Sequence, residues 1–409
     1  MSSESPLSPE RPSYASVLRT PHLSRSFLAS IIGRLSLATS GLALILLLEQ
    51  STGSFAVAGI ATATLGVANV VATPWRARLI DRHGQRLVVT ALGLVHAASL
   101  LGVGLSSSAG LPTLLLLSAL AGVSAPPFGA VMRVLWAAAL PAGPQRTRGF
   151  SLDAVAEEVT FAVGPLAAAV LAVVADPLSS LVVSAGCVAL GTALFVTSPR
   201  SRAQRGSRQV EVPDARPALR PLRSKGFLPI VLAMTAPGVM LGCVEVAAPA
   251  VAAAASSTVL AGALLAVFAA ASAIGGLLYG RWDLRARPER QLLVLTLALL
   301  AILTATGLLG GVGVAILGFA LSGIFLAPTL IVGYLAADAR TDSRARTEAS
   351  SWINTAVNLG AALGAAAFGA LTDIVGPGPA LTISAIGTLI LICGPLALND
   401  RRSGRWAHG

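Results

Sequence analysis

Charged residues are scarce in this sequence of 409 residues. Asp, Glu, Lys and Arg together make up 11% of it, whereas 55% of the residues are hydrophobic. Soluble domains carry roughly 25% charged residues, which keep their surface in contact with water. The composition therefore excludes a soluble globular protein and predicts a chain that crosses a membrane several times.

The sequence also lacks the common catalytic and nucleotide-binding motifs. Its one lysine, Lys225, follows a serine, so it cannot form the Gly-Lys-Ser/Thr phosphate loop of an ATP-driven pump. No His-Glu-x-x-His or Gly-x-Ser-x-Gly segment occurs. The three cysteines, Cys187, Cys243 and Cys393, lie inside apolar runs, which argues against a disulfide or a metal site. We therefore expect no enzyme activity, no cofactor and no metal, and we expect transport driven by a gradient.

The net charge of +11 is carried by basic residues in particular loops. Of the 29 Lys and Arg residues, only Arg34 and Arg133 lie inside apolar runs, and the others occupy the tails or every second polar connection. Basic loops mark the cytoplasmic side of a membrane protein. This alternation predicts two cytoplasmic termini, and it makes the lipid bilayer, rather than nucleic acid, the partner of the positive charge.

Twelve segments are long and apolar enough to cross a membrane, which takes about 20 residues. An even number of spans agrees with two termini on one side. The predicted spans are 27–49, 54–75, 86–107, 112–138, 150–174, 178–198, 227–249, 257–280, 290–309, 311–336, 347–372 and 378–398.

The longest polar interval divides the spans into two sets of six. Residues 199–226 contain eight basic residues and four prolines without helical periodicity, which is typical of a flexible cytoplasmic linker. The predicted organisation is an N-terminal tail (1–26), a six-helix half (27–198), the linker (199–226), a second six-helix half (227–398) and a C-terminal tail (399–409).

The two halves resemble each other at an offset of about 200 residues. Gly122 corresponds to Gly323, and Gly164 to Gly364. The fold class predicted is therefore an all-α membrane protein with twelve helices in two pseudo-symmetric halves. Such parallel repeats are related by an axis along the membrane normal, with the substrate bound between them near the midplane.

A charged segment between the second and third spans resembles the signature of the major facilitator superfamily (MFS). Ala77 and Gln85 depart from that signature, which has Gly and a basic residue at these positions. The resemblance implies a secondary transporter, similar to bacterial drug and metabolite efflux members, that works by alternating access as a monomer in the bacterial inner membrane. The matching residues are Leu79, Asp81, Arg82, Gly84 and Arg86.

The same resemblance implies a conformational latch in this loop. In the family, the charged loop is thought to hold the halves together in the outward-open state, with its Asp near the start of the eleventh helix. Carried over, Asp81 and Arg82 form the latch, Gly84 permits the turn and Arg86 contacts the surface. We expect Arg133, which lies in the cytoplasmic half of the fourth span, to pair with Asp81 as part of this gate.

The remaining basic residues of the loop have a simpler interpretation. Arg76 and Arg78 stand at the predicted cytoplasmic interface, where Arg residues anchor a span. We expect them to act as such anchors.

Ionisable residues inside spans are functional candidates, because a charge at the bilayer centre costs roughly 2.5–3.5 kcal/mol. Glu245 lies deep in the seventh span among apolar neighbours, which suits a carboxyl that binds and releases protons or meets a cationic substrate; alternatively, it reaches water at the outer helix end. Glu157 and Glu158 open the fifth span, where Glu157 is a second candidate for proton coupling and the helix dipole is the alternative explanation. Arg34, in the first span, meets an anionic substrate or a fifth-span acid, or extends to the inner interface.

Two asparagines in the eleventh span and an acid in the fifth span are the remaining polar residues to consider. Asn354 and Asn358 are one turn apart in the eleventh span, and we expect them to line the cavity rather than only join helices. For Asp153, at the start of the fifth span, the helix dipole is a sufficient explanation, and Arg146 and Arg148 are the available pairing partners.

Together these features predict proton-coupled export of a small amphipathic compound, with Glu245 and Glu157 exchanging protons against substrate. Two alternatives stay open. One is an importer or uniporter of a neutral or anionic metabolite that uses Arg34 as its anchor. The other is a membrane receptor or scaffold that has kept the fold and lost transport.

Overall fold

A computed structural model of the chain describes residues 13–206, 220–256, 258–282 and 286–389, and all regular secondary structure in them is helical. Eleven helical segments within these ranges are long and apolar enough to cross a membrane. A twelfth helix, predicted at 378–398, starts at residue 377 and is described up to residue 389. Residues 1–12 of the N-terminal tail, residues 207–219 of the linker, the end of the twelfth span with Cys393 and the whole C-terminal tail lie outside the described ranges.

The helices from the N-terminal tail to the start of the linker include the first six spans, which lie close to their predicted positions. The bounds of these helices are α1 (Tyr14–Leu18), α2 (Leu23–Thr52), α3 (Phe55–His83), α4 (Gln85–Leu105), α5 (Leu111–Ser124), α6 (Phe128–Ala139), α7 (Pro144–Val174), α8 (Pro177–Thr197) and α9 (Pro199–Ala203).

The end of the linker contains the 3₁₀ helix η1 (Pro221–Arg223), and the second half follows it. The helices of this half are α10 (Phe227–Ala233), α11 (Thr235–Ala254), α12 (Thr258–Arg281), α13 (Pro288–Leu309), α14 (Val312–Ala339), η2 (Ser343–Ala345) and α15 (Arg346–Val375).

Two predicted spans are interrupted. The fourth is divided into α5 and α6 by residues 125–127. Pro126 and Pro127 explain this break, because proline lacks the N–H that continues a helix and disfavours the helical conformation in the residue before it. The seventh is divided at Met234 into α10 and α11.

The predicted linker is less irregular than its composition suggested. Its first residues form the short helix α9, and the backbone N–H of Gln85 donates to the carbonyl of Gln204 (3.4 Å). The start of the linker therefore rests on the turn between α3 and α4.

Equivalent close contacts support the internal repeat. Gly122 of α5 packs against the backbone of α3 at Leu65, and Gly323 of α14 packs in the same way against α12 at Phe268. Gly164 and Gly364 likewise meet the backbones of α2 and α11. A side chain at any of these glycines would push two helices apart, which is how small residues bring membrane helices together.

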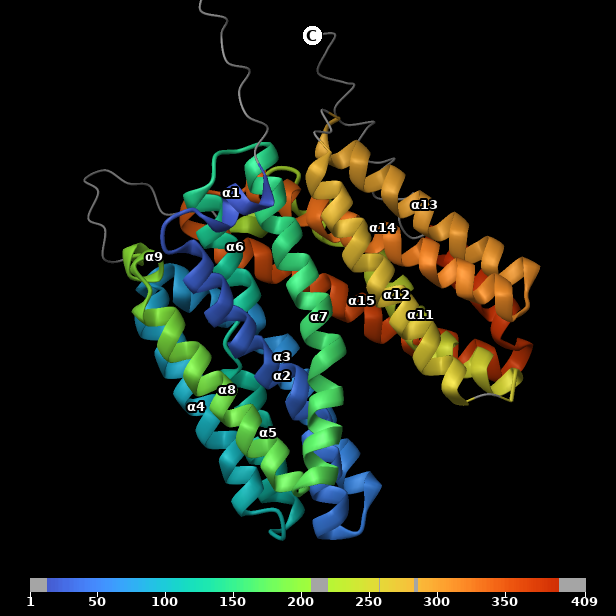
Figure 1. The fold of residues 1–409 in the computed structure, drawn as a ribbon, viewed down its shortest axis with the longest axis horizontal. Coiled ribbons are helices and arrows are strands. Elements are labelled where there is room, and N and C mark those ends of the chain that lie inside the picture. The colour runs from blue at the N-terminus through green and yellow to red at the C-terminus, as the bar shows by residue number, and fades with distance from the viewer. Residues whose placement is uncertain (1–12, 207–219, 257, 283–285, 390–409) are drawn as a thin grey trace, which may run out of the picture.

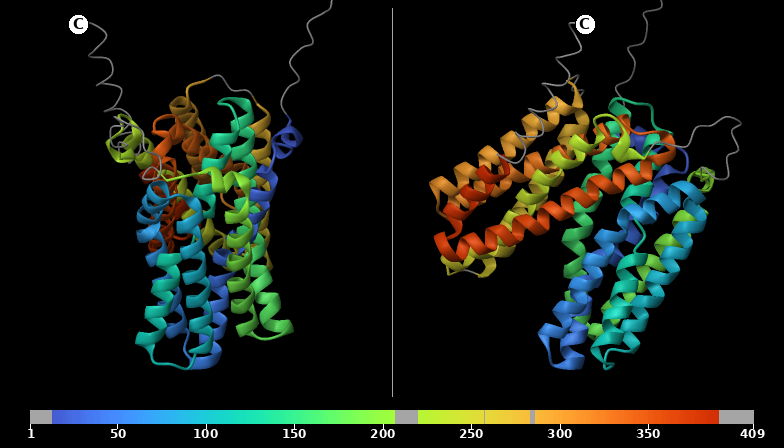
Figure 2. Two further views of the ribbon diagram at one scale, coloured as in Figure 1. Left: turned by 90° about the vertical axis from the view of Figure 1, so that its left-hand side faces the viewer. Right: turned by 180° about the vertical axis from the view of Figure 1, so that it is seen from behind.

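The two halves form the arms of a V (Figures 1 and 2). They meet at the end of the molecule that holds α1, α6 and the start of α15, and they diverge toward the far ends of α2 and α11. Contacts between the halves pair α3 with α15 and α7 with α12. The joined end carries the basic loops and is called the closed end below; the opposite end is called the open end.

Candidate transport cavity

A cavity of about 760 Å³ lies between the two halves. Its wall comes mainly from α2, α3, α6 and α7 of the first half and from α15 of the second. Apolar side chains such as Leu37, Val70, Phe161 and Leu359 form much of this wall. The charged side chains that line it are Arg34, Arg76, Arg133 and Glu157.

Asp153 of α7 lies behind this wall between two guanidinium groups. Arg34 forms an ion pair with one carboxylate oxygen of Asp153, and Arg133 with the other (3.0 Å). All three side chains are buried. Arg34 therefore meets a fifth-span acid, which was one of its predicted alternatives. The pairing of Asp153 with Arg146 or Arg148 that the sequence suggested is wrong, because Arg34 and Arg133 take its two carboxylate oxygens. Arg146 turns toward the second half and binds Asp338 (2.8 Å).

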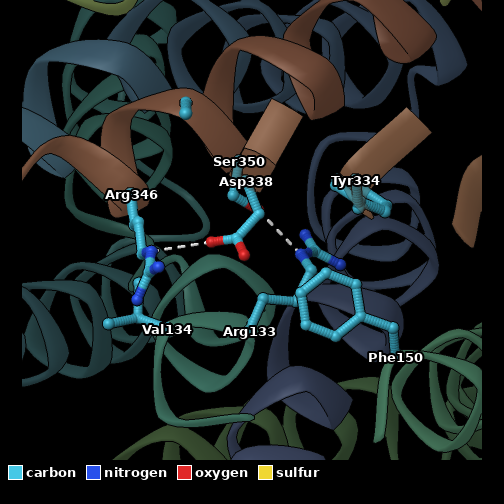
Figure 3. A pocket seen from close by; sticks show the side chains of 8 residues that line it. Arg133, Val134, Phe150, Tyr334, Asp338, Arg346 and Ser350 are labelled. Atoms are coloured by element: carbon cyan, nitrogen blue, oxygen red, sulfur yellow. Dashed lines mark hydrogen bonds and ion pairs between the residues drawn. The ribbon is translucent and has the colours of Figure 1, made fainter. Parts of the chain in front are cut away.

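Arg133 connects this buried cluster to the second half. It also contacts Glu157 (3.4 Å), its Nε donates to the hydroxyl of Ser350 (2.7 Å), and its guanidinium lies 3.7 Å from the centre of the Tyr334 ring. Figure 3 shows Arg133 reaching Ser350 beside Tyr334. The predicted pairing of Arg133 with Asp81 is therefore wrong: the α7 carboxylates and α15 hold its guanidinium.

Asp81 instead binds the start of α15. Its carboxylate accepts hydrogen bonds from the backbone N–H groups of Thr347 (3.3 Å) and Glu348 (2.9 Å). A carboxylate at a helix N-terminus meets unpaired N–H groups and the positive end of the helix dipole. Arg78 adds an ion pair to the Glu348 side chain (2.6 Å), a contact between the halves that its interpretation as an interface anchor did not include.

The other predicted latch residues lie around this contact. Gly84 forms the entire turn between α3 and α4 at a φ of +90°, a conformation that side chains disfavour. Arg82 and Arg86 are exposed. Asp81 and Arg78 of this segment both bind the start of α15 in the second half.

Further contacts join the halves at the closed end. Asp338 of α14 accepts from Arg146 and also pairs with Arg346 (2.7 Å; Figure 3). The hydroxyl of Tyr14 in α1 donates to the carbonyl of Leu277 in α12 (2.5 Å), and burial raises the pKa of this phenol. These contacts, with those of Asp81 and Arg133, seal one end of the cavity.

The predicted polar residues divide into two groups. Arg34, Arg133, Glu157, Asn354 and Asn358 line the same cavity. Glu158 and Glu245 are not among its lining residues. Glu158 turns from α7 toward α12, where it accepts a hydrogen bond from Ser272 (3.0 Å), and Glu245 is exposed on α11.

Arg76 is the cavity residue that the sequence interpretation missed. It is only 1% exposed, so its interpretation as an interface anchor is wrong. Its guanidinium donates to the carbonyls of Gly122 (3.0 Å) and Ala125 at the end of α5, and to Asn69 and Thr73 of its own helix. Asn69, Thr73 and Arg76 recur at helical spacing, so a polar stripe on α3 was the available signal.

The helices, the cavity and its sealed end define a multi-pass membrane transport protein rather than an enzyme. The Major Facilitator Superfamily model matches residues 26–253 and 238–409. The chain therefore belongs to this superfamily and is a secondary transporter, which favours transport over the receptor or scaffold alternative.

Solved structures share this fold at low identity. The human organic anion transporter MFSD10 is 16% identical with a TM-score of 0.70, and the alignment covers 93% of this chain and 99% of that one. A bacterial homologue of the iron transporter ferroportin in an outward-facing state is 16% identical, with a TM-score of 0.71 and the same coverage. A variant of the E. coli fucose:proton symporter FucP is 14% identical, with a TM-score of 0.70 over 92% and 98% of the two chains. No curated protein matches the sequence.

Proposed function

We propose that this transporter exports a small amphipathic compound in exchange for protons, by alternating access. The observation that carries the proposal is the cavity of about 760 Å³ between the halves, which is sealed at one end by polar contacts. Its apolar wall suits the hydrophobic part of a substrate, and its cluster of charged side chains suits a polar part.

The distribution of basic residues gives the orientation. The closed end carries the Arg-rich loops, and such loops face the cytoplasm. In this orientation both termini are cytoplasmic, the structure is open to the outside, and the protein lies in a bacterial inner membrane. The likeness to a ferroportin homologue in an outward-facing state supports the same conformation.

Glu157 is the carboxyl best placed to couple protons to this movement. Its side chain is 31% exposed at the cavity wall, and it shares Arg133 with Asp153. A proton on Glu157 removes one of the two negative charges that hold Arg133. Because Arg133 also binds Ser350 of the other half, proton binding changes a contact that must break when the closed end opens.

Import is the second candidate, with Arg34 as the anchor of an anionic metabolite. The position of Arg34 at the cavity wall favours it. Import predicts uptake that is independent of the proton gradient and is lost in Arg34→Ala.

Growth of an exporter-deficient bacterial host on a panel of toxic amphiphiles tests the main proposal. The wild type should protect against at least one compound, and equally expressed Glu157→Gln should not. Glu289→Gln is the matched control, because Glu289 pairs with Arg340 away from the cavity. Addition of a protective compound to inverted vesicles should also discharge a pH gradient. Equal protection by Glu157→Gln would remove Glu157 from coupling and leave Glu158 and Glu245 as the carboxyls to test.

A further inference from the structure

The charges around the cavity do not balance. Arg34, Arg76 and Arg133 bring three guanidinium groups to its wall, whereas Glu157 is the carboxylate among the described lining residues. Asp153, buried behind the wall, adds a second negative charge. Counted over these five described side chains, the cluster keeps one net positive charge.

Arg76 carries this unbalanced charge. Its described partners are the carbonyls of Gly122 and Ala125, the side chain and carbonyl of Asn69 and the hydroxyl of Thr73, all of which are neutral. Arg34 and Arg133, in contrast, share Asp153 and Glu157. His96, which lines the same cavity, donates from Nδ1 to the carbonyl of Ala121 (2.7 Å) and faces the hydroxyl of Ser36 with Nε2 (3.4 Å), so it does not change the balance in its neutral form.

A buried cation without a counterion is costly, and the end of the α5 dipole offsets only part of it. Two donors in the cluster also lack acceptors: the Nε atoms of Arg34 and Arg76 are buried without a hydrogen-bond partner. Both the charge and the unused donors point to the same missing group, a negatively charged oxygen acceptor.

We propose that the transported compound is an amphipathic anion, such as a hydrophobic carboxylate, whose charged group binds at Arg34 and Arg76. Its apolar part lies along Leu37, Val70, Phe161 and Leu359 in the same cavity. This inference rests on the proposed function for its transport step, but the binding step is measured separately. Glu158 and Glu245 are not among the residues that line this cavity, so neither forms part of the proposed binding surface.

Binding of three probes of similar shape to the purified full-length protein tests the inference. The probes are 2-naphthoate, the uncharged 2-naphthamide and the cation 2-naphthyltrimethylammonium, measured by calorimetry. The wild type should bind the anion at least about tenfold more tightly than the amide, since charge-assisted hydrogen bonds are about twice as strong as neutral ones. Tighter or equal binding of the amide or the cation would overturn the inference, and so would no binding of any probe.

Variants separate the charge of Arg76 from its structural contacts at the α5–α6 break. Arg76→Gln should reduce the preference for the anion to nearly one, whereas Arg76→Lys, which keeps the charge but not the hydrogen-bonding fork, should retain most of it. Arg290→Gln removes an exposed charge from the start of α13 and should leave the preference unchanged. If Arg76 only held the break together, both Arg76 variants would weaken all probes alike.

Flux measurements in proteoliposomes distinguish this inference from the proposed function. Anion binding without proton-driven flux would contradict proton-coupled export and leave the anion site intact. Proton-driven flux of uncharged or cationic probes that is independent of Arg76 would contradict the anion site and leave proton-coupled transport intact.

Discussion

The fourth span of the first half and its counterpart in the second half share a packing contact but differ in continuity. Gly122 and Gly323 meet α3 and α12 at equivalent positions. Beyond this contact the fourth span of the first half is divided into α5 and α6. Its counterpart in the second half, α14, continues as one helix through Pro328. The offset that relates Leu65 to Phe268 also relates Arg76 to Tyr279, so a guanidinium binds the broken span where the other half has a phenol.

This comparison teaches that the repeat preserves helix packing and not chemistry. The close contacts recur because any six-helix half must pack its spans. The charged cluster of Arg34, Arg76, Arg133 and Asp153 belongs to the first half alone. The second half supplies mainly neutral partners to it, such as Ser350 and Tyr334.

The largest effect is expected from breaking the charged cluster of the first half. Asp153→Ala leaves Arg34 and Arg133 buried without their shared partner, and breaking a buried ion pair in this way costs about 3–5 kcal/mol. Thermal unfolding of the purified protein should show a large loss of stability. In the second half, Glu289→Ala breaks a partly exposed pair with Arg340 and should cost less than about 1 kcal/mol. Similar losses in both variants would contradict the asymmetry.

The shared packing contact predicts matched effects in the two halves. Gly122→Val and Gly323→Val each force a side chain against the backbone of a neighbouring helix, and overpacking of this kind typically costs about 1–3 kcal/mol. The two variants should lose similar stability in the same unfolding assay. Tolerance of valine at one position alone would mean that the two contacts are not equivalent.

The contact of Asp81 with α15 should shift the balance between conformations more than it changes stability. Asp81→Asn removes a carboxylate from a helix N-terminus, worth roughly 0.3–2 kcal/mol. Paired labels on α3 and α15 near the closed end should report a larger fraction of molecules with this end separated. Arg86→Gln, an exposed residue of the same loop, is the comparison. If Arg86→Gln shifts the distances as much as Asp81→Asn, the contact of Asp81 is not the latch.

The sequence predicted the helices well and the side-chain pairings poorly. Apolar length, basic loops and the turn at Gly84 are local signals, so twelve spans and two halves could be read from composition and spacing. The partners of Arg133 and Asp153 depend on how α2, α6, α7 and α15 rotate around one another, which no local pattern encodes. Arg76 was missed because it stands beside an Arg-rich loop. In that sequence context, an Arg that anchors a span at the cytoplasmic interface cannot be told from an Arg that is buried and binds the end of a neighbouring helix.

A small effect, on stability alone, is expected at the counterpart of Arg76. The hydroxyl of Tyr279 donates to the side chain of Gln291, so Tyr279→Phe removes one hydrogen bond and no charge. A neutral hydrogen bond is worth about 0.5–1.5 kcal/mol, and this variant should lose that much stability in thermal unfolding while keeping the wild-type preference among charged probes. Arg76→Gln should change that preference instead. If Tyr279→Phe altered probe selectivity as strongly as Arg76→Gln, both halves would contribute to recognition of substrate charge. The remaining difference between the halves would then be the break between α5 and α6.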